Sequence, residues 1–392
     1  MQIRTINEIG DVRGKYILLR DDFNVQIIGG VISDAFRIES SLPTIKRLAA
    51  AGARIAIVSH LGRPGGERNM KYTLAPVAEF LKVKLIPDCL DKGFLPDMQD
   101  GDVVLLENVR FYAQEEENDP DFSTKLAAGF DIFVNDAFAV SHRAHASTVG
   151  VAEILPSYAG ELLGREIAEI TRVMENPKRP LLGLVSGAKI KSKIGVIKAL
   201  GKLCDKIIIA GGLGTSVYIA NNNKNIDMSA DNLEKYDAET DAQIHEIMSE
   251  FGDKIILPLE KGVGDRWAID AARVDKMMAD ILPTDIPMDE GPASIAEYER
   301  AIDNAKTIVW NGPVGMAEWQ PVWSAGTFAL AHYIADRTKA GQLESVVGGG
   351  DVVAALEATG TKDDMSYVST GGGAFLEFIE GIELPGIKVL EK

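Results

Sequence analysis

The chain has 392 residues, of which 46% are apolar and 25% are charged, the balance of a soluble globular protein. This length suits two domains of ordinary size, and no apolar run approaches the roughly 20 residues of a membrane helix. A formal net charge of −17 argues against nucleic acid or an anionic membrane as the main partner.

The start of the chain lacks the apolar core of a signal peptide, so we expect a cytoplasmic protein. Its cysteines, Cys89 and Cys204, fit neither a metal-binding nor a redox spacing. We therefore expect both thiols to be reduced and structural.

Short aliphatic runs alternate with helical patterns along the first 150 residues. Strands are predicted at residues 16–19, 54–58, 103–106 and 132–134, with helices such as 39–51 and 121–128 between them. Gly52 is suited to end the first of these helices. This alternation predicts a parallel sheet covered by helices.

The alternation pauses at residues 155–160, and a charged amphipathic stretch, Glu161–Glu175, follows. Pro177 and Pro180 then stop any helix. We interpret Glu161–Glu175 as a long helix that joins two domains.

After this point the same alternation resumes. Strands are predicted at residues 181–185, 206–209, 255–257, 307–309, 345–347 and 367–368. Ser294 and Glu297 have the spacing of a capping box, which predicts the start of one intervening helix, and the polar stretch 221–231 is predicted to be a loop. The fold class is therefore α/β, with two parallel sheets flanked by helices.

In such folds, ligands bind beyond the carboxyl ends of the strands. Each strand of the first half is followed by arginine, histidine or a carboxylate–amide pair, and these residues include Asp22, Asn24, Arg37, His60, Arg63, Arg110, Asn135, Asp136 and Arg143. The planar fork of arginine suits phosphate and carboxylate. Any one of these residues alone reads as a solvated surface residue, but their repetition at successive strand ends predicts an anion pocket.

The second half has neither the G-x-x-x-x-G-K-[ST] nor the G-x-G-x-x-G nucleotide motif. Glycine clusters follow its strands instead, at residues 186–189, 211–214, 311–315, 348–351 and 370–373. Glycines at strand-to-helix junctions let backbone N–H groups approach a ligand. We therefore expect a nucleotide site without a P-loop.

Two features of this half each have two readings. Asp351 follows three glycines, and its position fits either a helix N-cap or a ligand of nucleotide-bound Mg²⁺. Lys189 and Lys193 are one helical turn apart, so they could face the same phosphates, although such pairs are usually solvated.

Together, nine motifs resemble the phosphoglycerate kinase family, in that family's order and over nearly the whole chain. They are RDDFNV (20–25), SHLGRP (59–64), ENVRF (107–111), NDAF (135–138), HRAH (142–145), GAKIKSK (187–193), VWNGPVG (309–315), GGGD (348–351) and STGGGA (369–374). Any one of them is weak evidence, but the full set is very specific.

The resemblance implies two Rossmann-like domains that face each other across a cleft. Residues 1–158 would bind 3-phosphoglycerate, 159–178 would form the interdomain helix and hinge, 179–372 would bind the nucleotide, and 373–392 would return to the first domain. It implies reversible phosphoryl transfer between 1,3-bisphosphoglycerate/ADP and 3-phosphoglycerate/ATP in glycolysis and gluconeogenesis, by in-line transfer with hinge closure. It also implies a monomer.

The same resemblance assigns residues to each ligand. 3-Phosphoglycerate would lie on Asp22, Asn24, Arg37, His60, Arg63, Arg110 and Arg143. The nucleotide would lie on Lys193, Gly211, Gly212, Asn311, Glu318, Gly349, Gly350, Asp351 and Val352, with Asp351 on Mg²⁺. Arg37 and Lys189 match the positions that stabilise the phosphoryl group in transit.

The chain departs from the family pattern at Gln26, Ser186, Pro287-Met288 and Val352. Val352 stands where serine or threonine is usual, so a hydroxyl is lost near the nucleotide phosphates while the backbone N–H remains. None of these changes removes a charged group that the chemistry needs.

Two other functions are weighed against this one. A two-domain nicotinamide-dependent dehydrogenase is disfavoured by the absence of G-x-G-x-x-G. A secreted, two-lobed binding protein without catalysis is disfavoured by the missing signal core.

Overall fold

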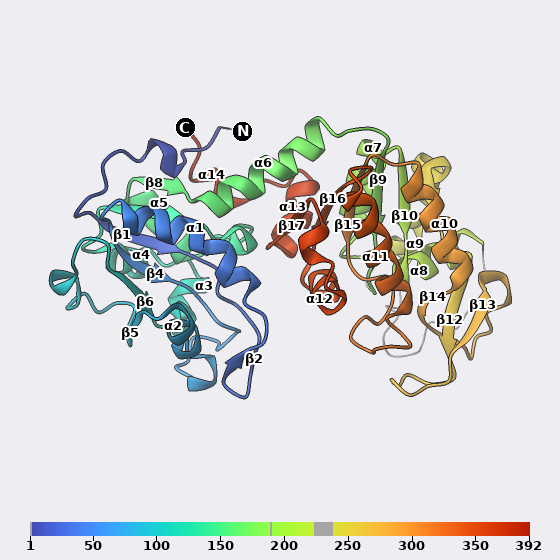
Figure 1. Ribbon diagram of the computed structural model, residues 1–392, viewed down its shortest axis with the longest axis horizontal. Coiled ribbons are helices and arrows are strands. Elements are labelled where there is room, and N and C mark those ends of the chain that lie inside the picture. Colours follow the sequence, from blue (N-terminus) through green and yellow to red (C-terminus); the bar gives the residue numbers. More distant parts are fainter. Residues whose placement is uncertain (1, 189, 223–237) are drawn as a thin grey trace. The chain divides into compact units, whose positions relative to one another are not determined.

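The computed structural model describes residues 2–188, 190–222 and 238–392. The chain divides into two compact units (Figure 1): unit 1 is Met1–Ala168 with Ile382–Lys392, and unit 2 is Glu169–Gly381. The boundary falls within helix α6 (Glu161–Glu175), which confirms the predicted helix and carries the chain from one unit into the next.

Unit 1 is built on a six-stranded parallel sheet in the order β5-β6-β4-β1-β7-β8. Its strands are β1 (Tyr16–Arg20), β4 (Arg54–Val58), β5 (Lys84–Ile86), β6 (Val103–Leu106), β7 (Ile132–Asn135) and β8 (Ser157–Ala159). The four predicted strands are confirmed. The predicted pause at residues 155–160 is wrong, because three of these residues form the edge strand β8, too short to show a periodic pattern.

Alternating side chains of these strands point to two separate cores, as a doubly covered sheet requires. Ile17 and Leu19 pack with helices α1 (Phe36–Ala50) and α2 (Ala75–Leu81). Leu18 packs on the other face with α4 (Pro120–Ala127) and α5 (Val151–Ile154). Burying each such side chain stabilises the fold by roughly 1.5–3 kcal/mol.

Unit 2 contains a second six-stranded parallel sheet, in the order β11-β10-β9-β15-β16-β17. Its strands are β9 (Leu181–Val185), β10 (Lys206–Ile209), β11 (Ile255–Ile256), β15 (Thr307–Asn311), β16 (Glu344–Gly348) and β17 (Tyr367–Ser369), and all six were predicted. Numbered along the chain, this order is 3-2-1-4-5-6, that of the Rossmann fold. Later strands are added on one side of β9 and then, from β15 onward, on its other side. The strand order therefore reverses between β9 and β15, and in unit 1 it reverses between β1 and β7.

Helices cover the second sheet as they cover the first. They are α7 (Ile194–Leu203), α8 (Gly211–Asn221), α9 (Ala238–Phe251), α10 (Pro292–Asp303), α11 (Ala325–Lys339), α12 (Gly350–Thr359) and α13 (Gly373–Ile379). The predicted capping box is wrong: the N-cap of α10 is Gly291, and Ser294 lies inside the first turn. Its hydroxyl instead accepts hydrogen bonds from the Leu259 and Glu260 N–H groups, both at 2.9 Å.

An antiparallel sheet that the sequence pattern did not predict completes unit 2. Its order is β13-β12-β14, with β12 at Glu260–Gly264, β13 at Val274–Met277 and β14 at Ile286–Glu290. Unit 1 adds the hairpin of β2 (Ile27–Ile28) and β3 (Val31–Ile32) and the short helix α3 (Ala113–Glu116). In the described part of the chain, no helix is long and apolar enough to cross a membrane.

The end of the chain packs within unit 1, where Figure 1 shows α14 (Pro385–Lys388) in red. The Gly386 N–H donates to the Ser141 carbonyl at 2.9 Å, and Asn135 Nδ2 donates to the Gly386 carbonyl at 3.0 Å. The Arg4 N–H donates to the Leu390 carbonyl at 2.9 Å. These bonds tie the last residues to the start of the chain and to the end of β7.

Candidate functional site

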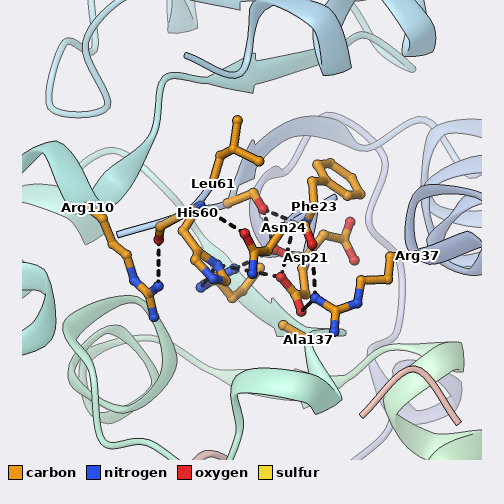
Figure 2. A network of polar contacts seen from close by, with 12 residues as sticks. Asp21, Phe23, Asn24, Arg37, His60, Leu61, Arg110 and Ala137 are labelled. Atoms are coloured by element: carbon orange, nitrogen blue, oxygen red, sulfur yellow. Dashed lines mark hydrogen bonds and ion pairs between the residues drawn. The ribbon is translucent and has the colours of Figure 1, made fainter. Parts of the chain in front are cut away.

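The first candidate site lies where β1 and β4 end. Asn24 Oδ1 accepts a hydrogen bond from the Gly62 N–H at 2.8 Å, and the Asn24 N–H donates to Asp22 Oδ1 at 3.1 Å. His60 Nδ1 lies 3.6 Å from Asp22 Oδ1, and the two residues are only 2% and 7% exposed. Figure 2 shows the Asn24, Arg37 and His60 side chains converging, with Arg110 to one side.

Arg37 reaches this group from the first turn of α1. The helix begins at Phe36, one turn earlier than the predicted residue 39. Arg37 Nη1 donates to Asp22 Oδ2 at 2.9 Å and to the Asn24 carbonyl at 3.1 Å. Burial alone would raise the pKa of Asp22, but Arg37, followed by His60 and Arg20, lowers it to about 2. Asp22 is therefore ionised, and it orients Arg37.

Arg110 holds the loop after β4 from the other side. It lies in a turn after β6, where its N–H donates to Asn108 Oδ1 at 3.0 Å. Arg110 Nη1 donates to the Gly62 carbonyl at 2.9 Å, and its Nε lies 3.2 Å from Glu116 Oε1. Arg63, the next residue after Gly62, is exposed.

A buried layer lies beneath these residues, and no local sequence pattern predicted its contacts. Arg20 Nε donates to Ser147 Oγ at 2.7 Å, and Ser147 Oγ donates to Glu115 Oε1 at 2.6 Å. Arg20 and Glu115 are fully buried. Burial lowers the pKa of His145 to about 3, helped by the positive charge of Arg110, and burial also lowers the pKa of His60 well below its ordinary value. Both imidazoles are therefore neutral hydrogen-bonding groups at physiological pH.

The predicted anion-binding residues thus come together to different degrees. Asp22, Asn24, Arg37 and His60 form one contact group, and Arg110 joins it through Gly62. Arg143 is half-buried, donates from Nε to His142 Nε2 at 3.2 Å, and contributes to the electrostatic field at Arg110. The guanidinium groups of Arg37, Arg110 and Arg143 are positively charged, and the imidazoles of His60 and His145 are neutral. Together they suit an anion with several oxygens.

The second candidate site is a cavity of about 530 Å³ in unit 2, where the order of the sheet reverses. This is where ligands bind in open α/β sheets. The predicted nucleotide residues that line it are Gly211, Gly212, Glu318 and Asp351. Other lining residues include Gly187, Ala188, Lys261, Trp267, Met288, Asp289, Gly315 and Met316.

Lys193, Asn311 and Gly349 form a group next to this cavity. Lys193 Nζ donates to Asn311 Oδ1, and Asn311 Nδ2 donates to the Gly348 carbonyl. A Cβ on Gly349 would lie 2.9 Å from Asn311 Nδ2, and one on Gly187, which lines the cavity, 3.9 Å from Lys193 Cε. Burial lowers the pKa of Lys193 to about 8.

Helix α7 begins at Ile194, so Lys193 is its N-cap residue and lies before the helix. Residue Lys189 lies outside the described residues. Neither a side-chain cap nor a proline marks the start of α7. A turn over residues 191–193 precedes the helix instead.

The N-terminus of α12 also meets the cavity. Its N-cap is Gly349, whose φ of +123° suits glycine, so the N-cap reading of Asp351 is wrong. The first backbone bond of the helix runs from the Val353 N–H to the Gly349 carbonyl at 3.0 Å. The N–H groups of residues 350–352 therefore precede it, and they form the positive end of the helix dipole. The Val352 side chain is fully buried, so only its backbone can serve a ligand.

The residues present fit a Mg²⁺ ion that arrives with nucleotide phosphates. In proteins such an ion usually takes one or two carboxylates together with phosphate oxygens and water. Asp351 is exposed at the cavity wall and supplies one carboxylate. No cluster of three or more metal-binding side chains occurs in the described ranges, so a closed protein cage is not formed there.

The Gly211 N–H donates to Glu290 Oε1 at 2.7 Å, so this backbone group is bonded within the protein, while Gly211 itself lines the cavity. Another part of the cavity wall is apolar. The ring of Trp267 lies 5.0 Å from the ring of Trp319, and Trp267 lines the cavity together with Met288. This apolar end suits a planar base.

Comparisons with known proteins agree with this architecture. A family model described as phosphoglycerate kinase matches residues 6–382. Phosphoglycerate kinase of Methylorubrum extorquens (strain PA1) is 43% identical over 397 residues, covering 99% of this chain and 98% of the relative. Phosphoglycerate kinase of Borrelia garinii subsp. bavariensis is 43% identical over 401 residues, covering 100% of both.

Two solved structures are similar over almost their full length. The phosphoglycerate kinase from Coxiella burnetii gives a TM-score of 0.83 at 37% identity and covers 99% of each chain. The phosphoglycerate kinase from Pyrococcus horikoshii OT3 gives a TM-score of 0.85 at 29% identity, covering 99% of this chain and 98% of that one.

Proposed function

The chain belongs to the phosphoglycerate kinase family and is a glycolytic phosphotransferase, and we propose that its two candidate sites divide the substrates between them. Unit 1 holds 3-phosphoglycerate, and unit 2 holds ATP or ADP. The observation that supports this division is a difference between the two units at the place where the strand order of each sheet reverses. In unit 1, arginine side chains lie around Asp22, whereas in unit 2 a cavity lies beside a helix N-terminus.

In unit 1, the substrate carboxylate and phosphate are bound by the arginines. The proposed contacts are Asp22, Asn24, Arg37, His60, Arg63, Arg110 and Arg143. The ionised Asp22 accepts a hydrogen bond from the substrate hydroxyl, the Asn24 amide accepts or donates one, and the neutral His60 binds without adding charge.

In unit 2, the base lies at the Trp267 end of the cavity and the phosphates lie toward α12 and Lys193. The proposed nucleotide contacts are Lys193, Gly211, Gly212, Asn311, Glu318, Gly349, Gly350, Asp351 and Val352. Asp351 binds Mg²⁺. When bound, this ion would neutralise negative charge that develops on the phosphates during transfer.

The transfer step needs alignment and charge neutralisation rather than a nucleophilic side chain. The substrate carboxylate is already the nucleophile, so no general base is required. Arg37 and Lys189 are the proposed catalytic residues, because a planar fork and an ammonium group can stabilise the equatorial oxygens of the phosphoryl group. Water must be excluded, since it would compete for the phosphoryl group.

Donor and acceptor must meet, so we assign α6 to a hinge that closes with both ligands bound. The proposed functional domains are residues 1–158 and 179–372, with 159–178 as the hinge and 373–392 as the tail. Within this tail, Ile382–Lys392 belongs to unit 1, whereas α13 still belongs to unit 2. Small-angle scattering should show a smaller radius of gyration with both ligands than with either one. An unchanged radius would argue against hinge closure.

We further propose that the protein is a cytoplasmic monomer that binds no nucleic acid, consistent with its net charge of −17. The activity is tested by an assay with 3-phosphoglycerate and Mg-ATP, coupled to an acyl-phosphate-dependent dehydrogenase that oxidises NADH. Consumption of NADH that needs both substrates is the expected result. If the protein shows no turnover with either ATP or GTP, the assignment is refuted.

A further inference from the structure

A buried ion pair lies at the wall of the proposed nucleotide cavity. Lys261 on β12 and Glu290 at the end of β14 are each 1% exposed, and Lys261 Nζ lies 2.6 Å from Glu290 Oε1. Lys261 also lines the cavity. Neither residue has a part in the substrate contacts or in the transfer step described above.

The pair binds both backbone polar groups of a single residue, Gly211. The Gly211 N–H donates to Glu290 Oε1 at 2.7 Å, and Lys261 Nζ donates to the Gly211 carbonyl at 2.8 Å. Gly211 begins α8 with a φ of +64°, and it lines the cavity together with Gly212. A residue without a side chain can be held only through its backbone, so these two bonds set the orientation of the peptide groups at the cavity wall.

The other side of Gly211 is closely packed. A Cβ at Gly211 would lie 2.4 Å from Ser186 Oγ, and the Leu213 N–H donates to the Gly187 carbonyl at 3.0 Å. Ser186 and Gly187 follow β9, the strand at the switch point. The start of α8 is therefore held between the ion pair and the loop after β9.

Stability alone does not account for this ion pair. Removing two charges from water costs several kcal/mol per ion, and apolar side chains of similar volume are often equally stabilising in such places. An apolar pair, however, could not bind the N–H and carbonyl of Gly211. Leaving a buried polar group without a partner costs about 1–3 kcal/mol, which would favour a shift of the Gly211 peptide.

We propose that Lys261 and Glu290 are positioning residues of the nucleotide site, which hold the Gly211 peptide and so keep the cavity wall in its binding shape before the nucleotide arrives. This inference rests on the nucleotide site proposed above. A wall that is ordered in advance lowers the free energy lost on binding. The ion pair therefore acts on the KM for nucleotide, and leaves kcat and 3-phosphoglycerate binding unchanged.

The test replaces Lys261→Met together with Glu290→Leu, which removes both charges at similar volume. We expect a folded protein with unchanged calorimetric affinity for 3-phosphoglycerate, a KM for Mg-ATP raised about tenfold, and kcat within about twofold. Lys261→Met with Glu290→Gln keeps an amide oxygen that can accept from the Gly211 N–H, so it recovers most of the lost affinity.

A matched control removes another ion pair of the same small sheet. Lys276 on β13 lies 2.7 Å from Asp285, and neither residue lines the cavity. Lys276→Met with Asp285→Asn should therefore leave the KM for Mg-ATP unchanged. A similar rise of KM in this control would show a general effect of disturbing the sheet and would overturn the positioning role.

A folded Lys261→Met, Glu290→Leu variant with the wild-type KM for Mg-ATP overturns the proposal, and so does a loss confined to kcat. Should the variants not fold, amide hydrogen exchange in the wild-type protein decides. The Gly211 N–H should exchange slowly without nucleotide, and exchange at the rate of an open loop contradicts the proposal. Wild-type protein that binds no Mg-ATP in calorimetry would instead refute the nucleotide site itself.

Discussion

Arg37 Nη1 lies 2.9 Å from Asp22 Oδ2, and this ion pair joins the first turn of α1 to the loop after β1. Arg37 is the largest of the influences that bring the pKa of Asp22 down from 3.8 to about 2. A lowered carboxylate pKa stabilises the fold above about pH 4, and this contribution is lost as the pH falls through 2. The pair thus holds a charged guanidinium group at the proposed substrate site, and the Asp22 carboxylate stays ionised.

Arg37→Ala should lower kcat by about 10²- to 10³-fold, because it removes a preorganised charge from the transferring phosphoryl group. The pKa of Asp22 should rise toward its ordinary value, which NMR titration can follow. Lys46→Ala, an exposed residue on the same helix, is the control and should change neither quantity. A wild-type kcat in Arg37→Ala would show that Arg37 has no part in the transfer step.

Asp351→Asn should weaken binding of Mg-nucleotide strongly and leave 3-phosphoglycerate binding unchanged, because the two ligands are assigned to different units. Calorimetric titration of each ligand separately makes the comparison. Asp351 is exposed in the first turn of α12, so the loss of its favourable interaction with the helix dipole should destabilise the protein by only about 0.3–1 kcal/mol. Glu357→Gln, farther along the same helix, is a suitable control. Equal losses for both ligands would contradict the separation of the sites.

Nucleotide affinity should depend on the protonation of Lys193. Burial lowers the pKa of this lysine to about 8, so its ammonium is lost as the pH rises through 8. Phosphate loses its last proton near pH 6, so the ligand charge is constant above about pH 7. The affinity for Mg-ATP should therefore fall above pH 8 by up to about tenfold per pH unit.

Lys193→Arg provides the control, because arginine stays protonated throughout this range. Its affinity, whatever its absolute value, should be flat between about pH 7 and about pH 9.5. A wild-type affinity that is equally flat would show that the charge of Lys193 does not contribute to nucleotide binding.

Much of this fold could be predicted from the chain, because parallel strands buried on both faces have a strong sequence pattern. The strands from β9 to β17 that form the second sheet illustrate this. The antiparallel β12, β13 and β14 were missed because their residues, such as Glu260 and Lys276, are too polar and irregular to read as strands. The edge strand β8 was missed because it has three residues.

The candidate sites show the same limit. Strand ends deliver Asp22 and His60 to one place because parallel strands end at one edge of a sheet, so their grouping could be expected from the sequence. Glu290 could not be assigned, because its partner Gly211 is 79 residues away and no local pattern relates them. The buried Arg20 and Glu115 layer depends likewise on contacts distant in the chain.

Asp136 should make stability fall with increasing pH. Burial raises the pKa of this carboxyl group, which accepts a hydrogen bond from the Leu163 N–H at 2.9 Å, from 3.8 to about 7. A raised carboxyl pKa contributes stability that is fully present below about pH 4 and is lost as the pH rises through 7. Asp136→Asn should therefore have a flatter Tm between about pH 5 and about pH 8 than the wild type. Parallel curves for the two proteins would contradict the raised pKa.

In the proposed reaction the phosphoryl group moves directly from ATP to the carboxylate of 3-phosphoglycerate, and 31P NMR of the enzyme with both substrates and Mg²⁺ can follow this transfer. We predict resonances of ADP and of an acyl phosphate, and no resonance of inorganic phosphate. Hydroxylamine added afterwards should convert the acyl phosphate to a hydroxamate and release inorganic phosphate. With Arg37→Ala the same products should form far more slowly. Release of inorganic phosphate from ATP without acyl phosphate would contradict the account, because it would show transfer to water.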